Sequence, residues 1–265
     1  MNGHPKGAAP QSRWLGRRLV HLDSCGSTND EAFALLASEG PGAHGAVVTA
    51  RAQTAGRGRQ GRVWIHAPGE GLALSVALCP EGASAEGLAL LPLAGAVAVA
   101  RTLASACGLR TSLKWPNDLL AGDRKLCGTV AEARYAGERP WAVVLGIGVN
   151  VNQEPGAWQD ALSGQATSVF AETGRRRNVE ALAAGVIAEL EPLVEAALGD
   201  PAEVISQAAP LWTHRAGEAL SVISSVGTWT GTFEGVAPDG ALRLRTPEGS
   251  VTVRYGDARR VRRTS

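Results

Sequence analysis

Ten residues, TAGRGRQGRV at positions 54–63, combine three glycines with three arginines. Glycine lets a backbone approach a ligand closely, and arginine binds phosphate or carboxylate through two parallel hydrogen bonds. The segment therefore predicts a loop that holds an anion. Its spacing of Gly56, Gly58 and Gly61 also fits the G-x-G-x-x-G pattern of dinucleotide-binding and kinase loops, so the surrounding residues must decide which anion is bound.

The surroundings exclude the common phosphate-binding loops. A dinucleotide-binding loop leads directly into a helix, whereas this one leads into VWIHAPGEG. A kinase carries V-A-I-K, H-R-D and D-F-G further along the chain, and none of these is present. A P-loop has Lys-Ser or Lys-Thr where this chain has Arg62-Val63. A solvated basic loop or an RNA-binding segment stays as the plain alternative, although the loop lies between two apolar strands.

Four further polar motifs flank the loop in sequence. They are STN (27–29), KWPND (114–118), DRKLCG (123–128) and GIGVN (146–150). Each combines a turn residue or a glycine with a side chain that can donate, accept or carry charge. Together with the arginine loop they form an ordered set of motifs along the chain.

Taken in this order, the motifs resemble those of the biotin protein ligases. The family signature G-R-G-R-x-G-R-x-W stands here as GRGRQGRVW (56–64), and the resemblance spans Ser27–Asn152. It implies an ATP-dependent enzyme that first makes biotinyl-5′-AMP and pyrophosphate. Such an enzyme then transfers biotin to the ε-amine of one lysine on a biotin carboxyl carrier domain. ATP and biotin are then the substrates, with Mg²⁺ accompanying ATP.

The resemblance also implies catalytic residues, which are Lys125, Arg57, Arg59 and Asp118. Lys125 would bridge the biotin carboxylate and the α-phosphate, as the main catalytic cation. Asp118 would help to deprotonate the incoming lysine amine, or would orient Lys114 or Mg²⁺; its plain alternative is a turn-forming role after Pro116. No metal ligand is assigned.

The same resemblance divides the remaining site into two ends. The biotin end would comprise Ser27, Thr28, Asn29, Gln53, Gly56, Arg57, Gly58, Arg59, Lys125, Gly128 and Gly146. The ATP end would comprise Arg59, Arg62, Trp64, Asn117, Lys125 and Asn150. Thr28 has an alternative role as a helix cap, and Trp64 has one as a core side chain. Three neighbouring arginines repel each other without an anion, so we expect the loop to become ordered when biotin binds.

Composition limits the classes of protein. The chain has 265 residues with 26 basic and 25 acidic side chains, so no global positive field points to nucleic acid. Four cysteines without C-x-x-C spacing indicate a reducing compartment. The N-terminus has no signal-peptide core, and the apolar run Leu88–Ala100 is shorter than a membrane span. We predict a cytoplasmic protein with no membrane partner and no specific nucleic-acid partner.

The resemblance implies an α/β (α+β) fold, in which helices back a mixed β-sheet, and the pattern of the sequence places its elements. The helix after STN would be capped by Thr28 with Glu31, and further helices would cover 90–107, 179–198 (interrupted at Pro192) and 202–212. The expected strands cover 45–50, 72–78, 111–116 and 141–152, with a hairpin beginning at DRKLCG and a loop at 153–166.

We expect three regions: a flexible tail (1–16), a catalytic domain (17–215) and a small SH3-like β-barrel (216–265) built from four short strands. About 20 residues precede the catalytic region, too few for a helix-turn-helix module, so we predict a ligase without repressor function. The family resemblance also allows a homodimer. Two rival functions remain: a lipoate or octanoate ligase on the same fold, and a nucleic-acid-binding protein that uses the arginine loop.

Overall fold

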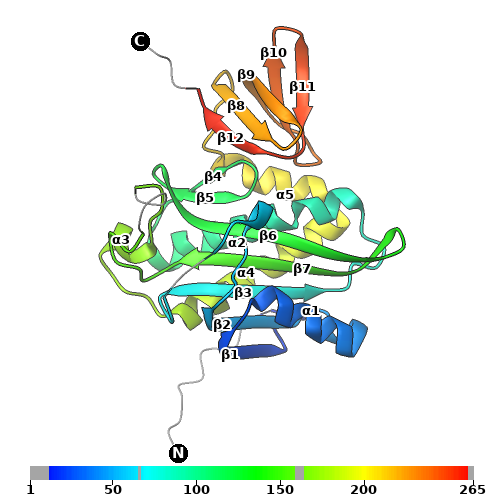
Figure 1. The fold of residues 1–265 in the computed structure, drawn as a ribbon, viewed down its shortest axis with the longest axis vertical. Helices are drawn as coiled ribbons and strands as arrows, with labels where there is room; N and C mark the ends of the chain where they lie inside the picture. The colour runs from blue at the N-terminus through cyan, green and yellow to red at the C-terminus, as the bar shows by residue number, and fades with distance from the viewer. Residues whose placement is uncertain (1–11, 65–66, 159–163, 262–265) are drawn as a thin grey trace, which may run out of the picture.

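The computed structural model describes residues 12–64, 67–158 and 164–261, which form a large α/β domain and a small C-terminal all-β domain (Figure 1). The large domain is built on a seven-stranded sheet in which β1 and β2 are parallel and the other neighbours are antiparallel. In spatial order its strands are β1 (Leu19–Cys25), β2 (Val47–Gln53), β3 (Gly71–Leu78), β7 (Arg139–Asn150), β6 (Arg124–Ala136), β5 (Asp118–Ala121) and β4 (Ser112–Lys114). The predicted mixed sheet is therefore confirmed.

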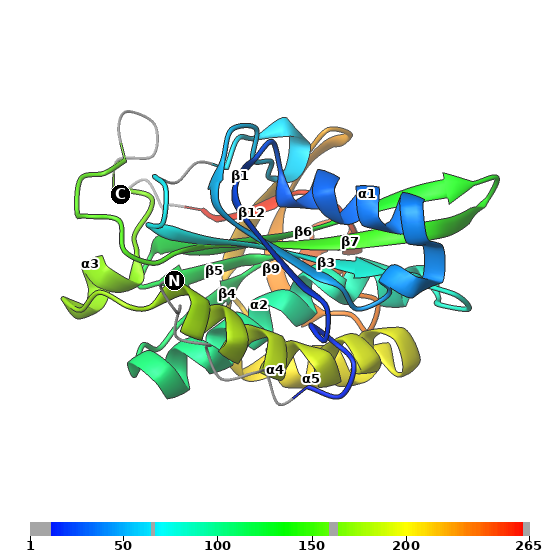
Figure 2. The same ribbon diagram turned by 90° about the horizontal axis from the view of Figure 1, so that it is seen from below.

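Helices cover both faces of the sheet (Figure 2). One face carries α1 (Thr28–Glu39), and the other carries α2 (Ala85–Cys107), α4 (Val179–Gly199) and α5 (Pro201–Ala208). Side chains alternate between the faces along each strand. On β7, Val143, Leu145 and Ile147 belong to the core shared with α2 and α4, whereas Ala142 and Val144 pack in the α1 core. The short α3 (Val169–Thr173) lies beyond the end of β7.

The C-terminal domain has five antiparallel strands, one more than predicted. In spatial order they are β11 (Gly249–Val253), β10 (Leu242–Thr246), β9 (Gly227–Val236), β8 (Ala219–Ser224) and β12 (Asp257–Arg260). Their inner faces form a separate core, which includes Leu220, Phe233 and Leu244. The sequence DARR of β12 has no apolar alternation, which is why the periodicity missed it.

Trp115 joins the two domains. It follows β4 of the large domain, but its indole is 2% exposed within the core of the C-terminal domain. The indole Nε1 donates a hydrogen bond to the carbonyl oxygen of Gly240 over 2.9 Å. The tryptophan of the KWPND motif thus connects the two domains structurally.

Three helix predictions need correction. Ser27, and not Thr28, caps α1, because its side chain accepts a hydrogen bond from the backbone N–H of Asn29. Helix α2 begins five residues earlier than predicted, where Ser84 caps it by accepting from Gly87. Pro192 does not interrupt α4, since buried side chains on both sides of it hold the helix in the core despite the missing hydrogen bond.

The predicted strands and tail also differ in part. The expected strand at 111–116 is only β4, and β1 was not predicted because its sequence has no clear alternation. Residues 12–16 are packed rather than loose, with Leu15 fully buried; residues 1–11 of the predicted tail lie outside the described residues. Glu191 of α4 fixes this segment by accepting backbone hydrogen bonds from Arg13, Trp14 and Leu15 over 2.8–2.9 Å.

Helix α2 is longer than the predicted helix at 90–107, and by length and composition it passes as a membrane span. Its position argues otherwise, because it is largely buried between the sheet and α4. Among the described residues it is the one helix that meets the length and hydropathy criteria. It is the central core helix of the large domain.

Candidate active site

A cavity of about 1060 Å³ opens on the α1 side of the sheet and extends to the C-terminal domain. The strand alternation that buries Ala142 and Val144 under α1 places Gly146 and Gly148 on the same face, where the helix has ended. Gly128 of β6 lies opposite Gly148. The GIGVN motif thus gives apolar side chains to the core and bare backbone to the cavity.

The glycines are required by close contacts. A Cβ on Gly148 would lie 2.4 Å from Cε2 of Trp64, and a Cβ on Gly146 would lie 2.5 Å from Oδ1 of Asn29. Trp64 therefore lies flat on the cavity floor, and its Nε1 is buried with no hydrogen-bond partner among the described residues. Gly56 does not line the cavity; it is buried against the carbonyl oxygen of Trp64, so its contribution is to the shape of the loop.

One end of the cavity is lined by hydroxyl and amide groups. Oε1 of Gln53 accepts hydrogen bonds from the backbone N–H and the hydroxyl of Thr28, over 2.8 and 3.0 Å. Ser75 of β3 approaches the Thr28 hydroxyl at 2.7 Å and Oδ1 of Asn29 at 2.6 Å. These contacts fix the amide of Gln53, whose Nε2 is left without a partner among the described residues and can donate to a ligand.

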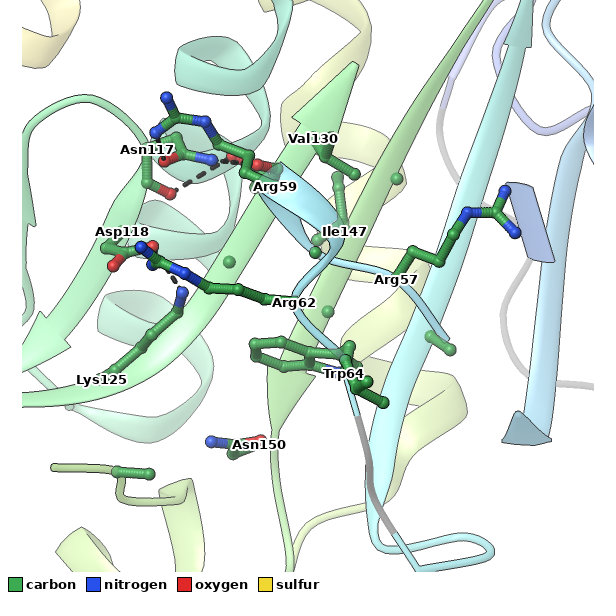
Figure 3. A pocket seen from close by; sticks show the side chains of 18 of the residues that line it. Arg57, Arg59, Arg62, Trp64, Asn117, Asp118, Lys125, Val130, Ile147 and Asn150 are labelled. Carbon is green, nitrogen blue, oxygen red and sulfur yellow. Dashed lines mark hydrogen bonds and ion pairs between the residues drawn. The ribbon is translucent and has the colours of Figure 1, made fainter. Parts of the chain in front are cut away.

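Arg57 lies on the opposite side of the loop from the other two arginines (Figure 3). It makes two hydrogen bonds of 2.7 Å to the carboxylate of Asp30 and lies 3.4 Å from Glu132. The pairing with Arg57 lowers the pKa of Asp30. Glu132 also accepts a hydrogen bond of 2.9 Å from Asn29, so it joins the arginine loop to α1.

The centre of the cavity holds an ion pair between two predicted catalytic residues. Nζ of Lys125 lies 2.6 Å from Oδ1 of Asp118, in side chains that are 34% and 20% exposed (Figure 3). The two residues lie on adjacent strands, because β5 and β6 form the predicted hairpin. Asp118 was predicted to orient Lys114 or Mg²⁺; the ion pair that the structure shows for it is with Lys125.

Arg59 and Arg62 point toward the Asp118 side of the cavity (Figure 3). Arg59 donates a hydrogen bond of 3.1 Å to Oδ1 of Asn117, and burial lowers its pKa. Arg62 forms an ion pair with Asp257 of the C-terminal domain, and Arg59 lies 4.0 Å from the same carboxylate. The expected repulsion between the arginines is therefore already relieved by carboxylates from α1, β6 and β12.

The remaining end of the cavity is formed by the segment after β7. The backbone of Lys125 pairs with this segment, since its N–H donates to Gln165 and its carbonyl accepts from Thr167. The side chain of Asn150 donates to the carbonyl of Thr167 over 2.9 Å. Trp158, at the edge of the described residues, also lines the cavity. Asn150 is thus engaged in holding the segment against Lys125.

The structure brings all the predicted site residues except Gly56 to one cavity. Sequence reasoning missed Ser75, Glu132 and Asp257, which hold predicted residues in place, and Arg259, which lines the cavity beside Asp257. Ser75 offered one signal, a single polar residue in the apolar strand LALSVAL. Asp257 offered none, because it contacts the site only through the packing of the two domains.

We find no group of three or more His, Cys, Asp or Glu side chains with metal-binding geometry in the part of the chain that the structure describes. The four cysteines are free thiols, and burial raises the pKa of Cys127 out of its usual range. The cavity lining combines cationic side chains with amides and carboxylates.

Comparison with known proteins shows to which family this fold and site belong. Residues 26–150 match the Biotin/lipoate A/B protein ligase family. The chain is 33% identical over 244 residues to the bifunctional ligase/repressor BirA of Bacillus subtilis, covering 89% of this chain and 71% of that protein. It is 36% identical over 236 residues to the biotin–[acetyl-CoA-carboxylase] ligase of Paracoccus denitrificans, covering 84% and 92%.

The fold agrees with these matches. The structure of a biotin protein ligase from Aquifex aeolicus in complex with biotin and ATP aligns with a TM-score of 0.78 and 26% identity, over 92% of this chain and all of that one. Fold and site together are those of a ligase enzyme. The chain belongs to the biotin/lipoate A/B protein ligase family, as the sequence motifs predicted.

Proposed function

We propose that this chain is an ATP-dependent biotin protein ligase. It joins biotin to AMP and then transfers biotin to a lysine of a carrier domain. The observation that carries the proposal is the position of the Lys125–Asp118 pair, between an amide-lined end and an arginine-lined end of one cavity. Relatives with biotin ligase names and a structural neighbour solved with biotin and ATP support it.

The amide-lined end suits the ring of biotin. A ureido group has a carbonyl that accepts hydrogen bonds and two N–H groups that donate them. Gln53 offers the free Nε2 donor, and the hydroxyls of Ser27 and Thr28 lie beside it. Lipoate and octanoate have no such groups, and a site built for hydrogen bonding discriminates strongly against ligands that leave it unpaired.

The first reaction step joins two anions, so charge neutralisation is its main requirement. A carboxylate oxygen of biotin attacks the α-phosphorus, and pyrophosphate leaves with the electrons of the broken P–O bond. Lys125 lies where it can contact both reacting groups, and Arg59 and Arg62 lie where they can bind the remaining phosphates. Each charge-assisted hydrogen bond contributes about 1.5–3 kcal/mol.

Mg²⁺ would bind together with ATP and would neutralise part of the negative charge of its phosphates. Mg²⁺ prefers oxygen ligands and keeps several waters, so one carboxylate beside the phosphates is sufficient to hold it. The oxygens of Asn117 and Asp118 line the cavity and fit that requirement. Asp118 would then leave Lys125 free to contact substrate.

The second step needs a neutral amine. The lysine of the carrier attacks the carbonyl carbon of biotinyl-5′-AMP, AMP leaves, and the amine loses a proton. Asp118 is the carboxylate nearest to Lys125 among the described residues, and we assign it the acceptance of that proton. We infer that the acceptor is a biotin carboxyl carrier domain of an acyl-CoA or pyruvate carboxylase, since a relative is named biotin–[acetyl-CoA-carboxylase] ligase.

Two parts of the sequence-based account stay predictions. A cytoplasmic location fits four free thiols, and cell fractionation would test it. The absence of repressor function would be tested by a gel-shift assay with biotin-operon DNA, biotin and ATP, in which we expect no shift. The nucleic-acid-binding alternative is disfavoured, because Arg57 and Arg62 are each paired with a carboxylate of this chain.

The proposal is tested by incubating the purified protein with biotin, MgATP and a carrier domain, and measuring biotin incorporation by mass spectrometry. We expect one biotin per carrier, on one lysine, only when ATP is present. A carrier whose target lysine is replaced by arginine serves as the control. Incorporation of lipoate or octanoate in place of biotin would move the function to the rival ligases.

A further inference from the structure

Asp257 reaches the active-site cavity from the C-terminal domain. It opens β12, and its side chain is 20% exposed. Its carboxylate forms an ion pair with Arg62 and lies 4.0 Å from a guanidinium nitrogen of Arg59. Among the described carboxylates, it is the one that links the C-terminal domain to the arginine loop.

The charge around Asp257 is strongly positive. Burial raises its pKa, but the hydrogen bond from Arg62 and the nearby charges of Arg62, Arg59 and Lys114 bring that pKa below its usual range. Asp257 is therefore a carboxylate anion at neutral pH. It occupies the part of the cavity where Arg59, Arg62, Lys114 and Arg259 could otherwise bind a polyanion.

We propose that Asp257 is a positioning residue for the nucleotide step: it holds Arg62 and Arg59 at the seam between the domains, and the phosphates of ATP replace it. This inference rests on the proposed ligase function. A single carboxylate carries one negative charge and a triphosphate carries several, so the phosphates bind the two arginines more strongly than Asp257 does. Asp257 keeps the arginines ordered before the nucleotide arrives, and it must release them afterwards.

The pairing with Arg62 is weak enough for exchange. The Arg62 side chain is 56% exposed, and ion pairs that involve exposed side chains are screened by water. Arg57 behaves differently, because Asp30 holds it through two hydrogen bonds on the far side of the loop. ATP binding therefore moves the Arg59–Arg62 side of the loop and leaves the Arg57 side in place.

The test compares KM values of Asp257→Asn with those of the wild-type enzyme in ATP–pyrophosphate exchange. Asparagine keeps the shape and removes the charge. We expect the KM for ATP to fall about 2- to 5-fold, the range of a partly exposed ion pair, with an unchanged KM for biotin. In an Arg62→Ala background the same substitution should have a smaller effect, because the partner of Asp257 is absent.

Two matched variants separate this role from a structural one. Asp257→Glu keeps the carboxylate and should move the KM for ATP much less. Glu234→Gln removes a carboxylate of the same domain that pairs with Arg245 at 2.5 Å, outside the cavity lining, and should change neither KM. If Asp257→Asn does not fold, Asp257→Ser supplies the same comparison with a smaller side chain.

An unchanged or raised KM for ATP in a folded Asp257→Asn enzyme overturns the proposal. It would mean that Asp257 does not compete with the phosphates, or that it binds with them. Failure of the ligase function itself looks different, because the wild-type enzyme would then show no exchange with biotin at all.

Discussion

The Lys125–Asp118 pair supplies two charged groups to the cavity from one hairpin. Both residues would belong to an ordinary surface hairpin if the cavity were absent. Their 2.6 Å contact places a cation and a carboxylate side by side in the cavity lining. In the two-step reaction proposed above, we assign the cation to the first step and the carboxylate to the second.

Lys125→Ala should abolish adenylation while the protein still folds, because the side chain is 34% exposed and contributes little to packing. Removal of one preorganised charge at a reacting centre costs about 100-fold or more in rate. Single-turnover formation of biotinyl-5′-AMP, measured by chromatography, would show this loss. The neighbouring Arg124→Ala, which removes a surface ion pair with Glu172, is the control and should retain activity. Turnover near the wild-type rate in Lys125→Ala would contradict the assigned role.

Substitution of Ser27 should affect stability, whereas substitution of Thr28 should affect biotin binding. Ser27 caps α1, so Ser27→Ala should lower stability by about 1 kcal/mol. Thr28 donates to Gln53, so Thr28→Val should raise the KM for biotin about 3- to 10-fold, as expected for one lost hydrogen bond. Denaturant unfolding and steady-state kinetics measure the two effects. Equal stability losses with no change in the KM for biotin would refute the division.

At this scale the sequence predicted well those residues that form contiguous motifs. The arginine loop, Lys125 and the glycines of GIGVN belong to motifs that the family resemblance identified, and residues of all three line the cavity. Asp257 and Glu132 were not found, since each acts on a residue that is 195 or 75 positions away in the chain. Gly56 was found but was given the wrong contact, because spacing does not say which side of a loop faces the ligand.

At the scale of elements, strand β7 shows how one segment serves both core and site. Every second side chain of β7 packs into the core on the α2 face of the sheet. On the α1 face, its glycines leave room for Trp64 and a ligand. The sequence predicted this strand because residues 141–152 form a long apolar run with glycines. It missed β1 and misjudged α4 at Pro192, where tertiary packing and not local pattern decides the outcome.

The attachment of residues 12–16 to α4 should depend on pH. Burial raises the pKa of Glu191, but the backbone N–H donors of Trp14, Leu15 and Arg13 lower it further. The resulting pKa is about 2, below the ordinary value of 4.5. A depressed carboxylate pKa gives stability that is complete above about pH 4.5 and is lost as the pH falls toward 2. Unfolding free energies should therefore fall across this range, by up to about 3 kcal/mol from this group.

Glu191→Gln is the matching variant. It should be less stable than the wild type at pH 7, and the difference should shrink as the pH approaches 2. Glu189→Gln, which removes the surface carboxylate 3.8 Å from Arg101, controls for general charge effects and should change stability little. A wild-type protein whose stability is constant between pH 4.5 and 2 would contradict the contribution of Glu191.

At the scale of the whole molecule, the C-terminal domain is part of the active site. Asp257 and Arg259 line the cavity, and Trp115 of the large domain completes the core of the small one. The spacing of four short strands and their turn signals predicted a separate small β-domain. It did not predict that a motif tryptophan would connect the two, since nothing in KWPND distinguishes an anchor from a ligand.

Trp115→Ala should uncouple the domains. The substitution removes a side chain that is 2% exposed and the hydrogen bond to Gly240, at a cost of about 3–5 kcal/mol. Calorimetry should show the C-terminal domain unfolding at a lower temperature than the large domain. Trp141→Ala, at a position 38% exposed, is the control with a much smaller effect. A single transition at the wild-type temperature would refute the anchoring role.

The central claim is that this cavity adenylates biotin. Exchange of labelled pyrophosphate into ATP, measured with the purified protein, Mg²⁺ and biotin, lipoate or octanoate in turn, tests it most directly. We predict exchange with biotin alone, lost in Lys125→Ala. Exchange with lipoate or octanoate instead would keep the fold and contradict the substrate, and no exchange with any acid in folded protein would contradict the account of the arginine loop itself.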